Sequence, residues 1–355
     1  MSRQTQAIIH ADAIINNFSV LSSIAPDCDA MAVIKADAYG HGGVNVARLL
    51  RGRAKRFAVA IIEEALVLRD AGIVEPIVVL EGAHQPRECA LAFQHNCILV
   101  MHTQQQLEWV RHCEPDQRPA IWLKVDTGMH RLGFAVDEIE HIVQAYHGIL
   151  CEETVLATHL ACADDEQSDA TPEQLAAFSK VAAQFNFPVS IANSPATILW
   201  PQSRRGWNRL GVGLYGSQPV AGDVNIKPAM TLRSSVIALR TIPAGDSVGY
   251  GQAWTATRDS RIATVGIGYA DGYPRHCPNG TPVIINGSKA ELVGRVSMDM
   301  ITIDVTDVPT VSIGDSVELW GENLSIDEVA AHAGTISYEL MTRISARVPR
   351  IVRHR

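Results

Sequence analysis

Lys35 is the residue whose surroundings most clearly favour chemistry. It directly follows the apolar run 31–34, which has the composition of a buried strand. A lysine at the end of such a strand is often only an exposed charge. When it is partly withdrawn from water, its amine loses a proton more easily and can attack a carbonyl carbon to form a Schiff base. The elements that surround Lys35 decide between these two interpretations.

Short apolar runs alternate with amphipathic segments from about residue 29 to residue 217. Their continuous apolar character, rich in Val and Ile, is typical of parallel strands covered on both faces. Segments 63–69 and 172–178 have helical patterns, and Thr171 before Pro172 is a candidate N-cap. Strands joined by helices in this way favour a (β/α)8 barrel over a doubly wound sheet. The strand-like runs are 29–34, 57–61, 76–80, 97–101, 120–125, 155–159, 188–192 and 210–214.

The pattern changes near Pro228, where glycine-rich turns begin to separate short strand-like runs. Such spacing indicates a compact, mainly β domain. We therefore expect a barrel over residues 1–228 and a smaller β domain over residues 229–355, with a helix at 326–333 before Gly334. The turns are 243–246, 285–288 and 313–315, and the runs include 262–265 and 301–305. Barrel active sites lie at the carboxyl ends of the strands, so Lys35 stands where catalytic groups are expected.

The bulk composition indicates a globular protein that acts on a small molecule. Apolar residues make up 47% of the 355 and charged residues 19%, and the net charge is −8. This acidic excess argues against nucleic acid or an anionic membrane as the main partner. The seven cysteines form no C-x-x-C pair and are odd in number, which favours a reducing compartment. No apolar stretch approaches the ~18 residues of a membrane span, so we expect a cytoplasmic protein.

Eight short sequence blocks extend through both expected domains: VIKADAYGHG (33–42), KVDTGMHRLG (124–133), THLACAD (158–164), NS (193–194), RLGV (209–212), GYG (249–251), GYADGYPR (268–275) and GRVSMD (294–299). These blocks resemble those of the alanine racemases and follow that family's order. A single block would be weak evidence, whereas the ordered set is highly specific.

The resemblance implies that Lys35 carries pyridoxal 5'-phosphate as a Schiff base. Racemisation removes the Cα proton on one face and delivers a proton on the other, so two opposed groups are the simplest arrangement. Lys35 and Tyr250 match the family's two acid/base residues, and Tyr250 would come from the second subunit of a homodimer with shared active sites. Because a free tyrosine has a pKa near ~10, nearby cations, with His159 and Arg209 as candidates, would have to favour its ionised form.

Arg209 matches the residue that faces the pyridine nitrogen of the cofactor in this family. An arginine donates hydrogen bonds and keeps its proton, so the nitrogen stays unprotonated and the ring withdraws electrons weakly. We expect transamination to be suppressed as a result. For the phosphate, the resemblance assigns Tyr39, Ser194, Gly211 and Val212. The stretch 193–195 also has the composition of a helix N-terminus, and the two interpretations are compatible.

Arg131 and the Met298 backbone of the other subunit match the family's contacts to the substrate carboxylate. Lys124 stands in the same block as Arg131, and in some relatives the matching lysine is carbamylated and orients the arginine. The resemblance assigns no metal ion. Four further residues match the family's path to the substrate, although structural ion pairs would explain the charged ones nearly as well: Asp164, Tyr269, Arg275 and Arg295.

One position departs from the family pattern. Some relatives have a tyrosine directly before the Arg-Val-Pro segment, where it touches the phosphate and narrows the substrate pocket. This chain has Ala346 before Arg347-Val348-Pro349. We expect more room beside the substrate side chain, and weaker discrimination against residues larger than alanine, unless a neighbouring side chain fills the space.

The family resemblance implies interconversion of L- and D-alanine, which supplies D-alanine for peptidoglycan or serves alanine catabolism. An amino-acid racemase of broader range is the nearest alternative. A decarboxylase with a similar barrel and β domain fits the Met-x-Arg-Leu-Gly and Arg-x-Gly blocks less well. A non-catalytic pyridoxal phosphate-binding protein and an aldolase-type barrel both leave the blocks around Tyr250 and Met298 unexplained.

Overall fold

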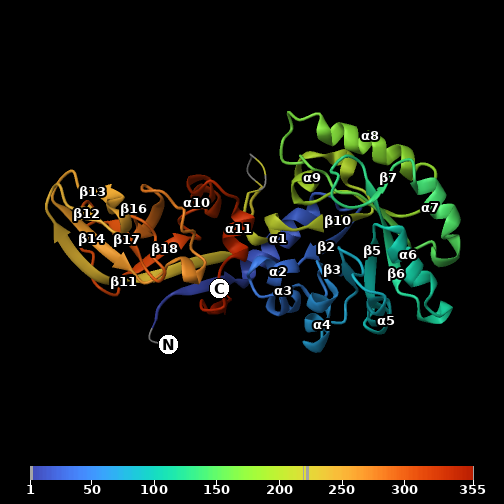
Figure 1. The fold of residues 1–355 in the computed structure, drawn as a ribbon, viewed down its shortest axis with the longest axis horizontal. Helices are drawn as coiled ribbons and strands as arrows, with labels where there is room; N and C mark the ends of the chain where they lie inside the picture. The colour runs from blue at the N-terminus through green and yellow to red at the C-terminus, as the bar shows by residue number, and fades with distance from the viewer. Residues whose placement is uncertain (1–2, 219, 221–223, 355) are drawn as a thin grey trace.

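The computed structural model describes residues 3–218, 220 and 224–354. Figure 1 shows an elongated molecule with a helix-covered barrel at one end and a β-rich part at the other. Two helices, α10 (Ile326–Ala333) and α11 (Ser337–Thr342), lie between these parts. No helix among the described residues is long and apolar enough to cross a membrane.

The first part is the predicted barrel of parallel strands. Its strands are β2 (Asp29–Val33), β3 (Arg56–Val59), β4 (Ile77–Val79), β5 (Cys97–Met101), β6 (Ala120–Asp126), β8 (Val155–Ala157), β9 (Val189–Ser190) and β10 (Trp207–Leu210), with β7 (Phe134–Ala135) paired to β6. They pair in chain order, and β10 returns to β2. The Arg209 amide closes the barrel by donating to the Ala192 carbonyl at 2.9 Å. Only the last run is displaced, since 212–215 form a 3₁₀ turn after β10.

Helices connect the strands and cover the barrel. The two predicted helical patterns are confirmed in α4 (Ile62–Asp70) and α8 (Ala170–Ala182). The predicted N-cap of α8 is wrong, because Thr171 lies buried inside its first turn and the Ser168 hydroxyl accepts the Ala170 amide at 3.3 Å. The other helices here are α1 (Ala11–Ser23), α2 (Lys35–Tyr39), α3 (Gly43–Leu50), α5 (Arg87–Gln94), α6 (Gln104–Arg111), α7 (Ile139–Ala145) and α9 (Ser194–Leu199). The 3₁₀ turns are η1 (Pro115–Gln117), η2 (His147–Ile149), η3 (Pro201–Ser203) and η4 (Val212–Tyr215).

The second part is a largely antiparallel sheet. Its strands are β1 (Gln6–His10), β11 (Met230–Ile242), β14 (Ser260–Val265), β15 (Pro282–Ile285), β16 (Ser288–Leu292), β17 (Ile301–Asp304), β18 (Ser316–Trp320) and β19 (Arg350–Arg353). A separate hairpin joins β12 (Ser247–Val248) to β13 (Trp254–Thr255), and η5 (Tyr250–Gln252) and η6 (Tyr269–Asp271) are short turns. The strand order is β14-β17-β16-β15-β18-β11-β1-β19. Because β14 also pairs with β11, a closed ring is formed by β14, β17, β16, β15, β18 and β11.

One strand departs from the expected division at residue 228. β1 pairs antiparallel with β11 and parallel with β19, so residues 6–10 belong to the second sheet although they precede the barrel. The predicted helix at 326–333 is confirmed as α10. The Ser325 hydroxyl caps it by accepting the Asp327 amide, and Gly334 ends it with a φ of 65°.

The second part packs directly behind Lys35 through α11. A Cβ on Gly40 would lie 2.3 Å from the Met341 carbonyl oxygen, so α11 can lie this close only because residue 40 is glycine. The Arg350 Nε of β19 donates to the Gly40 carbonyl at 3.0 Å. The elements that support Lys35 therefore come from both parts of the molecule.

Candidate active site

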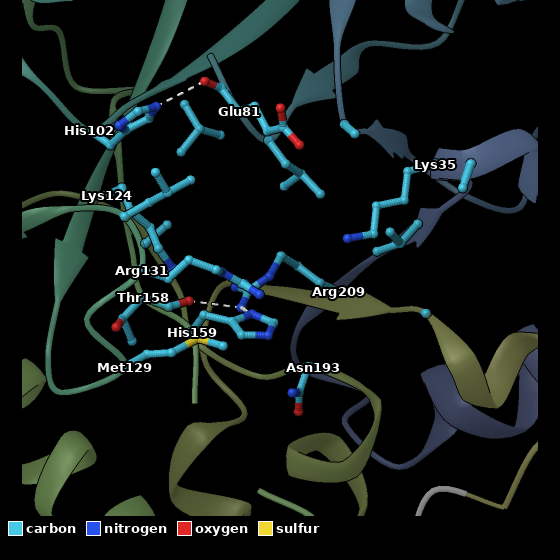
Figure 2. Close-up of a pocket in the computed structure, with 18 of the residues that line it drawn as sticks. Lys35, Glu81, His102, Lys124, Met129, Arg131, Thr158, His159, Asn193 and Arg209 are labelled. Carbon is cyan, nitrogen blue, oxygen red and sulfur yellow. Dashed lines mark hydrogen bonds between the residues drawn. The ribbon is translucent and has the colours of Figure 1, made fainter. Parts of the chain in front are cut away.

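A cavity of about 820 Å³ opens at the carboxyl ends of the barrel strands. It is lined by Lys35 after β2, Arg131 after β6, His159 after β8 and Arg209 in β10. Figure 2 shows Lys35 entering the cavity from one side, and Lys124 and Arg131 approaching from the other. Side chains from separate sequence blocks therefore share one cavity.

The Lys35 amine is prepared for chemistry by its surroundings. Burial lowers the pKa of its ammonium group below the ordinary value, and the positive charge of Arg131 lowers it further. The carboxylates of Glu81 and Glu64 act in the opposite direction. A larger neutral fraction at neutral pH is what a nucleophilic lysine needs, so the exposed-charge interpretation does not fit.

The chain directly after Lys35 forms a left-handed turn without glycine. Ala36, Asp37, Ala38 and Tyr39 all have φ values between 51° and 55°. Such a conformation costs an L-residue roughly 1–2 kcal/mol, and strain of this kind gathers at functional sites. The turn brings the Tyr39 ring onto that of Tyr215, with centroids 4.7 Å apart. Tyr39 thereby lines the cavity, with its hydroxyl beside Gly211.

Ser194, Gly211 and Val212 form a small polar cradle at one end of the cavity. The Gly211 amide donates to the Ser194 Oγ at 2.8 Å, and all three residues are buried. A Cβ at position 211 would lie 3.0 Å from the Tyr39 hydroxyl, so the glycine leaves space next to this hydroxyl. As predicted, Asn193 also caps α9, where its side chain accepts the Ala196 amide at 3.0 Å.

Arg209 is held rigidly by neutral acceptors. Its Nη1 donates to the Ser190 hydroxyl at 2.7 Å, and its Nη2 donates to the carbonyls of Thr158 at 2.8 Å and Ile191 at 3.0 Å. Burial lowers the pKa of the guanidinium to about 10, which still leaves it protonated. No described residue accepts from its Nε. A rigid cation whose Nε–H is without an acceptor among the described residues therefore lines the cavity.

His159 lies directly beside Arg209. The Arg209 Nη2 donates to the His159 Nδ1 at 3.2 Å, which makes Nδ1 the acceptor nitrogen of the ring. Burial, followed by the charges of Arg209 and Lys124, holds the pKa of His159 well below its ordinary value. His159 is therefore neutral beside the charged Arg209.

Lys124 in β6 lines the cavity. Among the described residues, no carboxylate forms a hydrogen bond with its amine. Burial, followed by the charges of Arg209 and Arg131, lowers its pKa well below the ordinary value. The exposed Arg131 follows in a loop that Asp126 shapes, since one oxygen of this carboxylate accepts both the Gly128 and the His130 amides at 3.0 Å. A positive charge on Lys124 is thus disfavoured by its burial and by the two neighbouring arginines.

Tyr250 and Met298 do not reach this cavity. They are 70% and 54% exposed, and neither is among the residues that line it. Figure 1 shows β12 and β13, the strands on either side of Tyr250, at the end of the β domain far from the barrel. The residues expected along the substrate path are also exposed: Asp164, Tyr269, Arg275 and Arg295.

Comparison with known proteins agrees with this geometry. Models of the alanine racemase N-terminal and C-terminal domains match residues 9–219 and 229–352. This chain belongs to the alanine racemase family. It is 64% identical to an alanine racemase of Alteromonas mediterranea over the whole of both chains. It is 43% identical to a catabolic alanine racemase of Pseudomonas putida, with 98% of each chain covered.

Solved structures of alanine racemases have the same fold. The biosynthetic alanine racemase of Pseudomonas aeruginosa superposes with a TM-score of 0.95 at 42% identity, covering 99% of this chain and 100% of that one. The alanine racemase of Acinetobacter baumannii gives 0.94 at 36% identity, with the same coverage. The chain is thus an isomerase of the racemase type, with the two-part architecture of this family.

Other residues that line or support the cavity were not singled out from the sequence. Glu81 and His102 line the cavity, and Glu64 bonds to the strained turn after Lys35. Glu64 falls in the predicted helix 63–69, but an acidic residue at a helix start is common and carries no signal of its own. In the part of the chain that the structure describes, no group of His, Cys, Asp and Glu is arranged to hold a metal ion.

Ala346, the position that departs from the family pattern, is exposed and does not line the cavity. The aromatic side chain that does enter from this C-terminal segment of the alanine racemase domain is Tyr338 in α11, whose ring lies 5.9 Å from that of Tyr39.

Proposed function

We propose that this chain interconverts L- and D-alanine with pyridoxal 5'-phosphate bound to Lys35. The observation that carries the proposal is the cavity itself. It places a lysine with a lowered pKa opposite a rigid arginine, next to a cradle where a Cβ on residue 211 would lie only 3.0 Å from the Tyr39 hydroxyl. The names of relatives that are 64% identical over their whole length support alanine as the substrate.

The residues present fit this cofactor. Lys35 would hold it covalently, the Arg209 Nε would donate to its pyridine nitrogen, and Ser194 with the amides of Gly211 and Val212 would hold its phosphate near the Tyr39 hydroxyl. When bound, pyridoxal phosphate supplies a ring that stabilises negative charge at the Cα of an attached amino acid. A protonated arginine at the nitrogen, rather than a carboxylate, keeps that stabilisation modest and disfavours transamination.

Proton transfer on the two faces of the substrate requires two groups. The Lys35 Nζ would act on one face, and Tyr250 of the partner subunit on the other. The exposure of Tyr250, away from its own chain's cavity, supports this sharing in a homodimer. His159 would be the group that hydrogen-bonds the oxygen of Tyr250 of the partner subunit.

Arg131 would pair with the substrate carboxylate, together with the Met298 amide of the partner subunit. Lys124 supports this role, since a neutral buried amine can add to carbon dioxide and lose a proton to form a carbamate. Such a carbamate would give the two neighbouring arginines a negative partner and would fix the Arg131 side chain. We therefore keep carbamylation of Lys124 as part of the proposal.

Incubation of L-alanine with the holoenzyme in deuterium oxide tests the reaction. Both enantiomers should appear with deuterium at Cα. Release of carbon dioxide would point instead to a decarboxylase, and absence of exchange would favour a non-catalytic cofactor-binding protein. Similar rates on alanine and on larger amino acids would indicate the broader racemase.

The cellular role belongs to the same proposal. All seven cysteines are free, which supports a cytoplasmic setting. D-alanine production would serve peptidoglycan, and the reverse direction would serve alanine catabolism; relatives named for each role are similar to this chain, at 42% and 43% identity. A requirement for added D-alanine in a strain that lacks the gene would identify the biosynthetic role.

A further inference from the structure

The left-handed turn behind Lys35 needs support from outside. Inside the turn, the Ala38 amide bonds to the Ile34 carbonyl at 2.8 Å and the Gly40 amide to the Ala36 carbonyl at 3.0 Å. These bonds resemble those of a right-handed turn and do not by themselves select the left-handed form. Since each of its L-residues is strained by roughly 1–2 kcal/mol, the turn persists only where its surroundings hold it.

Glu64 provides such a hold at the start of the turn. It stands in the first turn of α4, and its Oε1 accepts the Ala36 amide at 2.6 Å. Its Oε2 accepts the Ala60 amide, just after β3, at 2.7 Å. Both oxygens of one carboxylate therefore join the chain after β2 to the chain after β3. Hydrogen bonds to an ionised acceptor are the stronger kind.

The position of these bonds matters because Ala36 is the residue directly after Lys35. The direction of the Ala36 amide is set by the backbone torsion of Lys35, and this torsion in turn directs the Lys35 side chain. Without an acceptor, the Ala36 amide would lose its partner and the strained turn could relax. A displacement of about 1 Å at a reacting atom can cost on the order of 10²-fold in rate.

An ordinary helix-start role explains only half of these contacts. A glutamate in the first turn commonly accepts an amide a few residues earlier, as Glu64 does from Ala60. The bond to Ala36 reaches 28 positions back along the chain and serves no end of α4. Its partner belongs to the Lys35 turn, so this second bond requires another explanation.

We propose that Glu64 is a positioning residue that holds the strained turn behind Lys35 and thereby directs the Lys35 amine into the cavity. The proposal rests on the proposed function, in which Lys35 carries the cofactor. Glu64 also acts through its charge, since it opposes the lowering of the Lys35 pKa by burial and Arg131. Removing it should therefore alter both the geometry and the protonation of the cofactor-bearing lysine.

The test compares Glu64→Ala and Glu64→Gln with the matched control Glu63→Gln. Glu63 stands next to Glu64 on the same turn of α4 and is exposed. For each purified holoenzyme we would measure kcat, KM, thermal stability, and the pH at which the absorbance of the lysine-bound cofactor changes. Glutamine keeps an acceptor without the charge, so it separates the geometric part from the electrostatic part.

Glu64→Ala should lower kcat by about 10- to 100-fold with a smaller change in KM. Glu64→Gln should recover part of this loss, because its amide oxygen can still accept the Ala36 amide. In both variants the absorbance transition should move to lower pH, since a negative charge near the lysine nitrogen is gone. Glu63→Gln should behave like the native protein in every measurement.

Two results would overturn the proposal. One is a loss of thermal stability in Glu64→Ala with kcat and the absorbance transition unchanged, which would leave only the helix-start role. The other is a Glu64→Gln variant whose kcat, KM, thermal stability and absorbance transition all match those of Glu63→Gln. This second result can be obtained even if Glu64→Ala fails to fold.

Reduction of the native holoenzyme with borohydride, followed by peptide mapping, separates this proposal from the function beneath it. A pyridoxyl group on a lysine other than Lys35 would refute the proposed function. A group on Lys35 in the native protein and in Glu64→Gln, together with control-like kinetics, would refute only the role of Glu64.

Discussion

Two regions hold their candidate residues in opposite ways: the barrel mouth, which is the cavity at the carboxyl ends of the strands, and the tip of the β domain, which is the β12–β13 hairpin around Tyr250. At the mouth, Arg209 and His159 lie in a shared cavity and bond to each other. Tyr250 at the tip is 70% exposed, and Met298, which lies near Ala270 elsewhere on the β domain, is 54% exposed. The backbone at both residues is nevertheless well defined, since Gly249 and Gly251 on either side of Tyr250 have φ values of 75° and 69°, and the Met298 carbonyl accepts the Ala270 amide at 2.9 Å.

This difference indicates what each region needs from elsewhere. On the proposed function, the mouth would need an acid/base group on the second face of the substrate, and Tyr250 would supply it. Large exposed side chains on an ordered backbone are typical of surfaces that another molecule covers. Each region would then be half of a site that is completed when two chains meet around a twofold axis.

The largest expected effect comes from separating the two halves by mutation. Lys35→Ala and Tyr250→Ala should each lower kcat by at least ~10³-fold, because each removes the proton-transferring group on one face. When the two proteins are mixed and allowed to exchange subunits, about a quarter of the sites should be intact, since half of the dimers are mixed and each of these has one native site. No recovery despite demonstrated exchange would place both groups in one chain.

A smaller effect should come from filling the cradle at the mouth. In Gly211→Ala the new Cβ would lie 3.0 Å from the Tyr39 hydroxyl, so cofactor affinity should fall by about 10- to 100-fold while the tip is unaffected. Gly148→Ala is the matched control, because a Cβ there meets nothing within 4 Å. Adding Tyr39→Phe should recover part of the loss. The measurement is cofactor binding to the apoprotein, followed by absorbance. A native affinity in Gly211→Ala would contradict a role of the cradle in cofactor binding.

The turn after Lys35, behind the mouth, should also lose stability in acid. Burial lowers the pKa of His41, which supports the Lys35 turn through the Ala38 and Tyr39 carbonyls, to about 4. Because an unfolded histidine titrates near ~6.5, the folded state binds fewer protons below that pH. The contribution of His41 is complete above about pH 6.5 and falls by about 2–3 kcal/mol as the pH drops to about 4.

Urea unfolding at several pH values checks this prediction. His41→Gln should be less stable than the native protein at pH 7, and its stability should depend less on pH between about 6.5 and about 4. Tyr250→Phe, at the exposed tip, should keep the native pH dependence. Parallel curves for the native protein and His41→Gln would contradict the assignment.

The smallest effect tests whether the β domain also contributes to the mouth of its own chain. Tyr338 in α11 lines the cavity, so Tyr338→Ala should enlarge it and raise the efficiency for serine relative to alanine by about 3- to 10-fold. Tyr338→Phe keeps the ring and should keep the native preference. An unchanged preference in Tyr338→Ala would restrict the contribution of the β domain to the other subunit.

Much of the barrel could be predicted because its strands are local apolar runs. Lys35, Arg131, His159 and Arg209 were identified as candidates, since family blocks preserve residue types at the strand ends. Their protonation could not be predicted, because the neutrality of His159 depends on charges that the fold brings together from β6 and β10. These groups are distant in the chain and adjacent only in the structure.

Other features were missed for related reasons. The left-handed turn has no glycine at residues 36–39, so nothing in its composition indicates positive φ. Glu64 looks like an ordinary helix-start residue until its bond to Ala36 is seen. The placement of β1 in the second sheet also depends on pairing with remote strands, which apolar periodicity cannot specify.

This placement of β1 has a consequence for how the protein is made. Ala7 pairs with Leu232 on one side and with Arg350 on the other, so the second sheet needs segments that are synthesised far apart in time. The barrel strands, which pair mainly with near neighbours, can assemble while synthesis continues. A newly made chain would thus form most of its barrel before the second sheet closes, and α11, which packs against Gly40 behind Lys35, would join late.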